Sequence, residues 1–244
     1  HGSVTSISTL LPTYATVDLT ALAHNLSRIK RYLSPGCEIM AIVKANAYGH
    51  GAVEIAQSLA RQGIGQFAVA SLDEGIALRQ SGLSASIVIL GALFEEQVPD
   101  LIAHRLTPVV SDGRILPTLA KAVRSQQAPY SIHLKVETGM GRLGFSQEEL
   151  LAVLDNPLLH SPLQVEGMMT HLADADGADS AFTERQLAAF HALLEQIRLR
   201  GLTVPLVHAA NSAAIVRFPA AHFSLVRPGI MLYGYHTLPA TIPD

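Results

Sequence analysis

The sequence has no tryptophan, a single cysteine and few charged residues, and each shortage excludes something. The one cysteine, Cys37, cannot form an intramolecular disulfide, which fits a reducing compartment. Only 15% of the residues are charged and the net charge is -3, so the chain lacks the basic surface that nucleic-acid-binding proteins need. No run reaches the roughly 18 apolar residues of a membrane span, and no signal-peptide pattern is visible. We therefore expect a cytoplasmic protein that binds neither nucleic acid nor membrane.

Apolar residues are abundant, at 49% of the 244 residues, which is enough for a well-packed core. Short apolar or β-branched runs alternate with segments whose apolar residues have helical spacing. The eight runs lie at 39–43, 67–70, 87–90, 107–110, 130–136, 163–169, 204–207 and 223–226. Such alternation predicts an α/β fold with a parallel sheet. Eight units favour a (β/α)8 TIM barrel, with an open doubly wound sheet as the alternative.

The two ends of the chain lie outside this pattern. Residues 1–12 begin His-Gly-Ser and are interpreted as a tag remnant and flexible amino terminus, and 236–244 as a tail. An amphipathic helix capped by Thr20 is predicted before the first barrel strand. Because no long helix follows the eighth strand, we expect this helix to take the eighth helix position. Residues 14–17 are predicted to form an additional strand, and 13–235 a single barrel domain.

Polar residues stand directly after several predicted strands, where parallel barrels place their active sites. Lys44 ends an almost unbroken apolar run, so its amine is placed to lose hydration and act as a Schiff-base nucleophile or proton carrier. The loops after strands seven and eight commonly bind phosphate in barrels. A lysine beside such a phosphate site indicates pyridoxal phosphate. The other strand-end residues are Tyr48, Glu137, Arg142, His171, His208, Asn211, Ser212, Arg227, Gly229 and Ile230.

Five motifs resemble those of the alanine racemase family. The segment VKANAYGHG at 43–51 is similar to the family's cofactor-lysine signature. The similarity continues in order through KVETGMGRLG at 135–144, TH at 170–171, NSAA at 211–214 and RPGI at 227–230. The resemblance implies a fold-type III barrel that binds pyridoxal 5'-phosphate over 13–235. It also implies that the family's C-terminal β-domain is absent from this chain.

The resemblance assigns roles to the strand-end residues. Lys44 would form the internal aldimine and be the base for one alanine enantiomer. Arg227 would face the pyridine nitrogen, and because arginine only donates hydrogen bonds, that nitrogen would stay unprotonated, favouring proton removal and return over transamination. His171 would pack beside the cofactor ring. The remaining cofactor-binding residues, most of them at the phosphate, would be Tyr48, Asn211, Ser212, Gly229 and Ile230.

Lys135 lies in a strand run whose alternation directs it inward together with His133, so its charge needs a partner. The resemblance implies that Lys135 is carbamylated and positions Arg142. Arg142 would then contact the cofactor's phenolic oxygen and the substrate carboxylate. Glu137 is the alternative source of negative charge. The predicted catalytic residues are therefore Lys44, Arg142 and His171.

Two further patterns compete with this interpretation. Three glycines at 139, 141 and 144 spell G-x-G-x-x-G after a strand, with Glu166 further on, as in dinucleotide-binding loops. Their position at the fifth strand of eight argues against that function. The acidic stretch at 174–179 lacks a complete calcium-loop pattern, and the eleven histidines are scattered, so we expect no protein metal site.

The leading hypothesis is an isomerase that interconverts L-alanine and D-alanine, supplying D-alanine as a peptidoglycan precursor in a bacterial cytoplasm. By the resemblance, the full-length enzyme is a homodimer in which a tyrosine of the C-terminal β-domain is the opposing base. The alternative is a non-catalytic single-barrel carrier or regulator that binds pyridoxal phosphate. The barrel does not distinguish alanine from serine or another small amino acid as the substrate.

Overall fold

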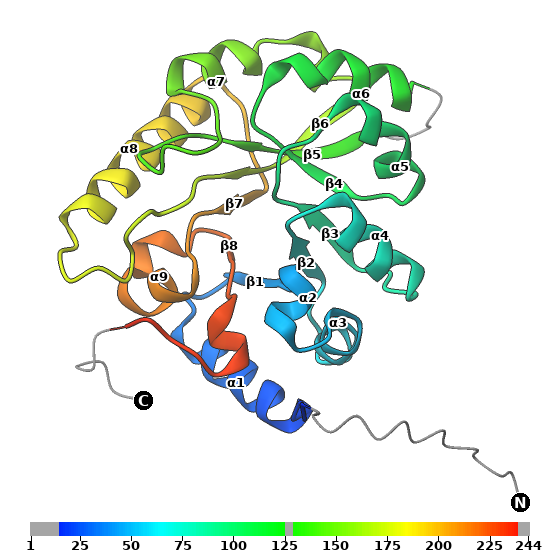
Figure 1. Cartoon of the computed structure of the whole chain (residues 1–244). Helices are drawn as coiled ribbons and strands as arrows, with labels where there is room; N and C mark the ends of the chain where they lie inside the picture. Colours follow the sequence, from blue (N-terminus) through cyan, green and yellow to red (C-terminus); the bar gives the residue numbers. More distant parts are fainter. Residues whose placement is uncertain (1–14, 125–128, 239–244) are drawn as a thin grey trace, which may run out of the picture.

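The eight predicted strands form a closed parallel barrel (Figure 1). The computed structural model describes residues 15–124 and 129–238. Each strand pairs with the next one in the chain, and β8 closes the barrel by pairing with β1. The strands are β1 (Glu38–Ile42), β2 (Gln66–Val69), β3 (Ser86–Ile89), β4 (Thr107–Val110), β5 (Tyr130–Lys135), β6 (Leu163–Met169), β7 (Leu206–His208) and β8 (Leu225–Val226). The barrel prediction is confirmed, and the open sheet is excluded.

Helices cover the outside of the barrel between successive strands. The predicted capping box at α7 is present, with Ser146 and Glu149 each accepting the other's backbone N–H. None of the helices in the described ranges is long and apolar enough to cross a membrane. The helices that follow the strands are α2 (Lys44–Gly49), α3 (Ala52–Arg61), α4 (Leu72–Gln80), α5 (Val98–Ala103), α6 (Leu116–Val123), α7 (Gln147–Leu154), α8 (Ala181–Leu199) and α9 (Ser212–Arg217), with 3-10 turns η1 (Glu95–Gln97), η2 (Gly113–Ile115), η3 (Pro157–Leu159), η4 (Pro219–Ala221) and η5 (Ile230–Tyr233).

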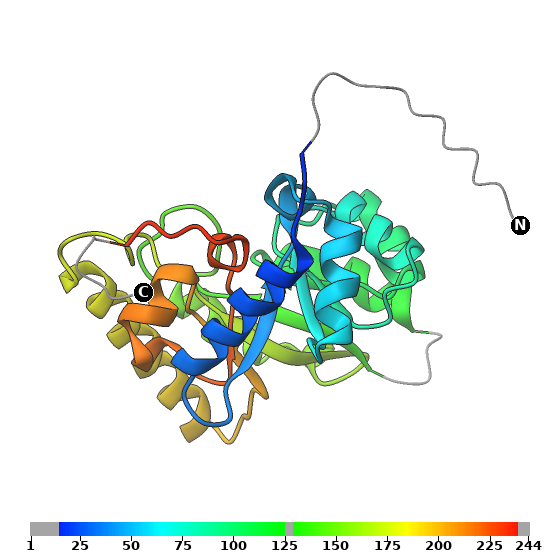
Figure 2. The same ribbon diagram turned by 90° about the horizontal axis from the view of Figure 1, so that it is seen from below.

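The helix before the barrel, α1 (Leu19–Tyr32), takes the position of an eighth barrel helix, as expected. It crosses the outside of the barrel between α3 and α9 and contacts η5 (Figure 2). The predicted cap at Thr20 is wrong by two residues. Asp18 is the N-cap, and its carboxylate accepts the N–H of Thr20 at 2.7 Å and of Ala21 at 3.2 Å. A carboxylate also suits the positive end of the helix dipole.

The additional strand expected at 14–17 is not formed in the part that the structure describes. Residues 15–18 carry no strand assignment and are exposed. The barrel is closed, so β1 already has β2 and β8 as neighbours and no barrel edge remains to pair with this segment. The interpretations of 1–12 and of 239–244 concern residues outside the described ranges.

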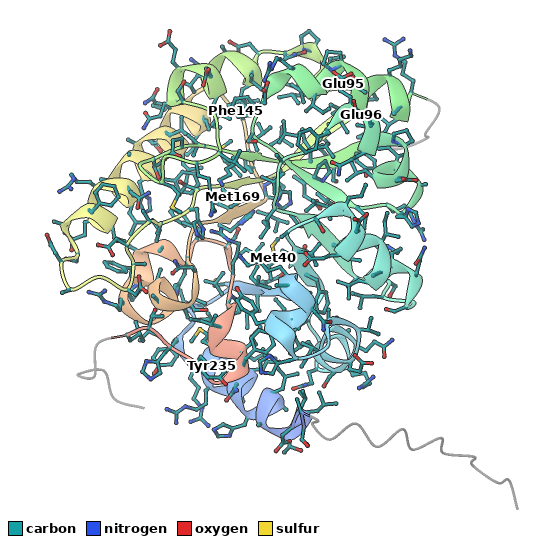
Figure 3. The ribbon with its side chains drawn as sticks, viewed as in Figure 1. Met40, Glu95, Glu96, Phe145, Met169 and Tyr235 are labelled. Carbon is teal, nitrogen blue, oxygen red and sulfur yellow. The ribbon has the colours of Figure 1, made fainter. Side chains whose placement is uncertain are left out.

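The core has two layers, one between the helices and the barrel and one inside the barrel. The inner layer is small, and Figure 3 places Met40 and Met169 near its centre. Alternation along each strand assigns one set of side chains to each layer. On β5, for example, Ile132 and Leu134 belong to the outer layer. The apolar residues of the inner layer are Met40, Ile42, Ala68, Val88, Val109, Met169 and Leu225.

Candidate active site at the carboxyl ends of the strands

One cavity of about 420 Å³ opens at the carboxyl ends of the barrel strands. The ten residues to which the sequence assigned a catalytic, cofactor, substrate or carbamylation role all line it, from five different strand ends. Their roles stay predictions, but their convergence is a structural fact. The strand-end residues Glu137 and His208 are not in the lining. The residues that line the cavity are Ile42, Lys44, Tyr48, Ala70, Leu90, Gly91, Lys135, Arg142, Leu143, Met169, His171, Asp176, Asn211, Ser212, Ala213, Arg227, Gly229, Ile230 and Thr237.

The short element α2, which Lys44 begins, is a left-handed turn rather than a right-handed helix. The four residues 45–48, Ala-Asn-Ala-Tyr, all have φ between +50 and +54 and ψ between +37 and +50. This conformation costs L-residues roughly 1–2 kcal/mol each, so the surrounding structure must hold it. The turn brings Tyr48 back to the cavity that Lys44 enters, with the Lys44 Nζ 6.0 Å from the centre of the Tyr48 ring.

Neighbouring side chains hold this turn in place. Asn46 Oδ1 accepts the N–H of the first residue of α3 at 2.9 Å. His50 Nδ1 lies 3.0 Å from two carbonyl oxygens of the turn, so Nδ1 carries the proton. Tyr233 of η5 stacks on His50 at 4.8 Å between ring centres and donates to the carbonyl of Ile42 at 2.9 Å. The loop after β8 is thereby locked to the turn after β1.

The loops after β7 and β8 meet at Ser212. Its Oγ accepts the N–H of Gly229 at 2.9 Å and of Met231 at 3.4 Å. Asn211 is the N-cap of α9, and its Oδ1 accepts the N–H of Ala214 at 3.0 Å. The Asn211 side chain therefore orders the start of α9, whose first residues Ser212 and Ala213 line the cavity.

Gly229 makes room for Tyr48. A Cβ atom at Gly229 would lie 2.6 Å from the Tyr48 hydroxyl oxygen, closer than real Cβ atoms approach, and 3.3 Å from Cζ. Burial raises the pKa of Tyr48, so its hydroxyl keeps the proton that it can donate. The hydroxyls of Tyr48 and Ser212 and the backbone of 229–231 thus surround one small space. This is a set of hydrogen-bond donors that suits an anion.

Arg227 is buried at the inner end of the cavity, with 4% of its surface exposed. Its Nη2 donates to the carbonyls of Thr170 and Ala209, each at 3.0 Å, and its Nη1 donates to His208 Nδ1 at 2.9 Å. Burial lowers the pKa of Arg227 to about 9, which leaves the guanidinium protonated at neutral pH. The guanidinium is held by neutral acceptors.

Two imidazoles extend this contact through the barrel interior. Because the guanidinium only donates, His208 accepts at Nδ1 and carries its proton on Nε2. That Nε2 lies 3.0 Å from His133 Nδ1, which therefore accepts, and His133 Nε2 lies 3.7 Å from Glu166 Oε2. Burial, and then the charge of Arg227, keeps the pKa of His208 well below its ordinary value. Donation therefore runs from Arg227 through His208 to His133, whose Nε2 has Glu166 nearby but beyond hydrogen-bond distance.

Sequence reasoning placed His208 at a strand end and His133 inward, but it missed their connection. Glu166 entered only as the acidic residue of a dinucleotide fingerprint. In the fold it lies on β6 beside His133 instead. Gly167 leaves space for the His133 ring, since a Cβ there would lie 2.5 Å from it. The available signal was the pair of inward histidines on strands five and seven.

His171 follows β6 and lies beside Arg227, with its Nδ1 3.3 Å from Nη2. Burial, together with the four cations around the site, lowers the pKa of His171 to about 3, so the ring is neutral at ordinary pH. Gln186 of α8, buried at 1% exposed, donates to the His171 carbonyl at 3.1 Å and accepts the N–H of Ala173 at 2.9 Å. Gln186 thus positions the loop that follows β6. Sequence reasoning considered the residues after strands and therefore missed this residue, which lies on a helix.

Lys135 is buried at 3% exposed, and no salt bridge to it is present among residues 15–124 and 129–238. Burial, followed by the charges of Arg142 and Arg227, lowers the pKa of Lys135 to about 8. Glu137 does not pair with it directly. Its carboxylate accepts the backbone N–H of residues 139, 141 and 142 at 2.5, 2.8 and 3.2 Å, so it orders the loop that carries Arg142.

The competing patterns have other places in the fold. The glycines at 139, 141 and 144 all have positive φ and form the turn around the Glu137 carboxylate. In the acidic stretch, the carbonyls of Ala175 and Gly177 accept from Arg217, at 2.7 and 2.5 Å. No cluster of metal-ligating side chains is present in the part of the chain that the structure describes.

Comparison with known proteins identifies the family. A family model described as alanine racemase, N-terminal domain, matches residues 17–237. The chain belongs to the alanine racemase family. It is 44% identical over 223 residues to the alanine racemase of Carboxydothermus hydrogenoformans, covering 91% of this chain and 60% of that one. It is 40% identical to the alanine racemase of Sorangium cellulosum, with 96% and 63% covered.

Solved structures of the family agree with the fold. The alanine racemase of Clostridium difficile 630 in complex with cycloserine superimposes with a TM-score of 0.87 at 32% identity, covering 93% of this chain and 63% of that one. The Bacillus anthracis alanine racemase with bound L-Ala-P gives 0.83 at 32% identity, with 92% and 58% covered. The chain thus spans about 60% of the length of the racemases that it matches.

Proposed function

We propose that this chain is the cofactor-binding barrel of an alanine racemase that uses pyridoxal 5'-phosphate. The observation that carries the proposal is the convergence of Lys44, Arg227 and the Tyr48–Ser212 donor set on one cavity. An amine, a fixed cation and an anion site at one rim match the aldehyde, the ring nitrogen and the phosphate of this cofactor. Family membership supports the same assignment.

The residues fit the phosphate end of the cofactor. Tyr48 and Ser212 would donate their hydroxyl protons to it, and Ile230 its backbone N–H, while the N–H of Gly229 holds the Ser212 oxygen in place beside it. The absent side chain at Gly229 keeps the space open. Asn211 would act through the α9 N-terminus that it caps. His171, neutral and held by Gln186, would lie against the ring.

When bound, the cofactor supplies the electron-withdrawing conjugation that acidifies the α C–H bond of an amino acid. Arg227 would face the ring nitrogen as a donor that keeps its own proton, because its pKa of about 9 remains above neutral pH. The neutral rings of His208 and His171 add no further positive charge beside it. A ring nitrogen that stays unprotonated withdraws electrons less strongly. This favours return of the α proton over transamination, as racemisation requires.

Racemisation needs a proton-transferring group on each face of the α carbon. Lys44 would remove or return the proton on one face. By family resemblance, the group for the other face is a tyrosine of the C-terminal β-domain, contributed across a homodimer. Alanine, held by its carboxylate at Arg142, is the proposed substrate, and D-alanine is the biosynthetic product.

Lys135 is proposed to be carbamylated. A pKa of about 8 leaves a minor but substantial fraction of neutral amine at pH 7, and only that form attacks carbon dioxide. A nitrogen–carbon bond forms, one proton leaves, and the buried cation becomes an anion between Arg142 and Arg227. Carbon-13 NMR of the protein in labelled bicarbonate should show a carbamate signal that Lys135→Ala removes. Electron density for an unmodified amine paired with a carboxylate would contradict it.

The function is tested by proton NMR of α-deuterium exchange, following L-alanine and D-alanine separately in heavy water with the chain and pyridoxal phosphate. Exchange of one enantiomer without inversion, abolished by Lys44→Ala, is the result expected of the barrel alone. Exchange with racemisation would mean that a second base lies within this chain. Absence of exchange with both enantiomers, despite cofactor binding at Lys44, would overturn the enzyme assignment in favour of a carrier.

A further inference from the structure

Glu74 makes contacts that its position in a helix cap does not require. It is the third residue of α4 and forms a capping box with Ser71, whose Oγ accepts the Glu74 N–H at 3.4 Å. The Glu74 Oε2 accepts the N–H of Ser71 at 3.3 Å and of Ala70 at 2.7 Å. Its other oxygen, Oε1, accepts the N–H of Ala45 at 2.6 Å, from a loop 29 residues away. One carboxylate therefore joins the ends of β1 and β2.

The chain contains a matched helix cap without this extra contact. In α7, the Glu149 Oε2 accepts the Ser146 N–H at 2.8 Å, and the Ser146 Oγ accepts the Glu149 N–H at 3.2 Å. Among the described residues, no further backbone donor to the Glu149 carboxylate is present. The two boxes share residue types and helix position, so the contacts to Ala70 and, across the barrel rim, to Ala45 are what distinguish Glu74.

Ala45 is the residue at which the left-handed turn begins, and it directly follows Lys44. The N–H groups on either side of this point bond to the backbone, that of Val43 to Ala68 at 2.9 Å and that of Ala47 to Val43 at 2.9 Å. The N–H of Ala45 bonds to Glu74 instead. A bond to an ionised acceptor is stronger than one to a carbonyl, which suits a strained residue.

We infer that Glu74 is a positioning residue for Lys44. Its carboxylate fixes the peptide plane between Lys44 and Ala45, and that plane sets the direction in which the Lys44 side chain leaves the backbone. The amine is thereby held in the cavity with Tyr48. The inference rests on the proposed function of Lys44. It adds to the site a residue, Glu74, that does not line the cavity.

The experiment compares E74Q and E74A with E149Q and Lys44→Ala in the intact chain. Pyridoxal phosphate is added, the adduct is reduced with borohydride, and the labelled lysine is identified and timed by peptide mass spectrometry. Glutamine offers one oxygen where the carboxylate offers two, so E74Q cannot accept from both strand ends. We expect labelling of Lys44 to slow at least tenfold in E74Q and E74A and to keep its rate in E149Q.

Amide hydrogen exchange of Ala45 in the cofactor-free chain is the second readout. We expect exchange at least tenfold faster in E74Q than in E149Q, with the two variants similar in urea midpoint. A purely structural role would lower the urea midpoint of E74Q and leave Lys44 labelling unchanged. That result overturns the inference while the proposed function stands. If the unmodified protein does not label at Lys44, the proposed function fails instead, and Ala45 exchange still reports on Glu74.

Discussion

The two halves of the barrel interior differ in chemistry. Strands β1–β4 fill the inner layer with apolar side chains such as Met40 and Val88. Strands β5–β8 add buried His133 and His208 to the apolar Met169 and Leu225, and buried Arg227 follows directly after β8. The side chains of the apolar half need no hydrogen-bond partners, so any apolar residue that packs well can replace them. The polar half is directional, because each donor must meet an acceptor, and this direction begins at the group proposed to face the cofactor.

Breaking the polar half should have the largest effect. Arg227→Met keeps much of the side-chain volume but removes the donors to His208 and to two carbonyl oxygens. We expect the free energy of unfolding to fall by about 3–5 kcal/mol, as when one member of a buried polar network is removed. Urea denaturation followed by circular dichroism measures it. Arg198→Met, at an exposed arginine paired with Glu195, should leave the urea midpoint unchanged. Equal effects would contradict the comparison.

Weakening the apolar half should cost stability without changing protonation. Met40 is fully buried, and Met40→Ala should lower the unfolding free energy by about 2–5 kcal/mol through lost burial and a cavity. The dependence of that free energy on pH should stay that of the original protein, because the imidazoles keep their partners. Urea titrations at several pH values test this. A changed pH slope would show that the two halves are coupled.

A smaller change should disturb the contact between the two histidines. Gly167→Ala places a methyl group against the His133 ring, and we expect a loss of about 1–3 kcal/mol. Nitrogen-15 NMR should show shifted ring signals for His133 and His208. The control is Gly65→Ala, where the added methyl meets open space. Unshifted ring nitrogens in Gly167→Ala would argue against the assigned tautomers.

The gentlest perturbation is pH. The pKa of His171 is about 3 in the folded state, against an ordinary value of 6.5, and that of His208 is also lowered. At pH values below about 6.5, these histidines bind more protons in the unfolded chain than in the folded one. The free energy of unfolding therefore falls as the pH drops. Each such histidine contributes up to about 1.4 kcal/mol per pH unit. The slope of unfolding free energy against pH should flatten in His208→Asn, whose amide oxygen can still accept from Arg227. An unchanged slope would mean that His208 is not neutral.

The sequence predicted the barrel well because apolar runs and helical spacing report directly on burial. Strand ends then located Lys44, Arg227 and the loops around Ser212, since parallel strands bring their carboxyl ends together. The left-handed turn was not predictable, because alanine has no preference for positive φ and nothing local indicates the contacts that hold it. The contact from His208 to His133 depends on register, including a shift between Ile132 and His133 in the pairing with β6.

Gln186, Glu74 and Asp18 were missed for a related reason. Glu74 and Gln186 bond to backbone groups distant in the sequence that only the folded chain brings near, whereas Asp18 bonds to N–H groups two and three residues on. Asp18 shows the limit most simply, since both Asp18 and Thr20 are good N-cap residues and only the start of α1 decides between them. Patterns of side-chain type locate helices and strands within a few residues. Identifying hydrogen bonds from side chains to backbone groups requires the three-dimensional structure.

The turn that starts at Lys44 has a stereochemical consequence for the protein's own alanines. Ala45 and Ala47 are L-residues held at φ of +50 and +54, the mirror image of the helical region. A D-alanine introduced at the exposed position 45 by chemical ligation would sit there without strain, and should raise the unfolding free energy by about 1–2 kcal/mol. In a family named for interconverting L-alanine and D-alanine, this chain holds two of its own L-alanines in the backbone conformation that D-alanine prefers.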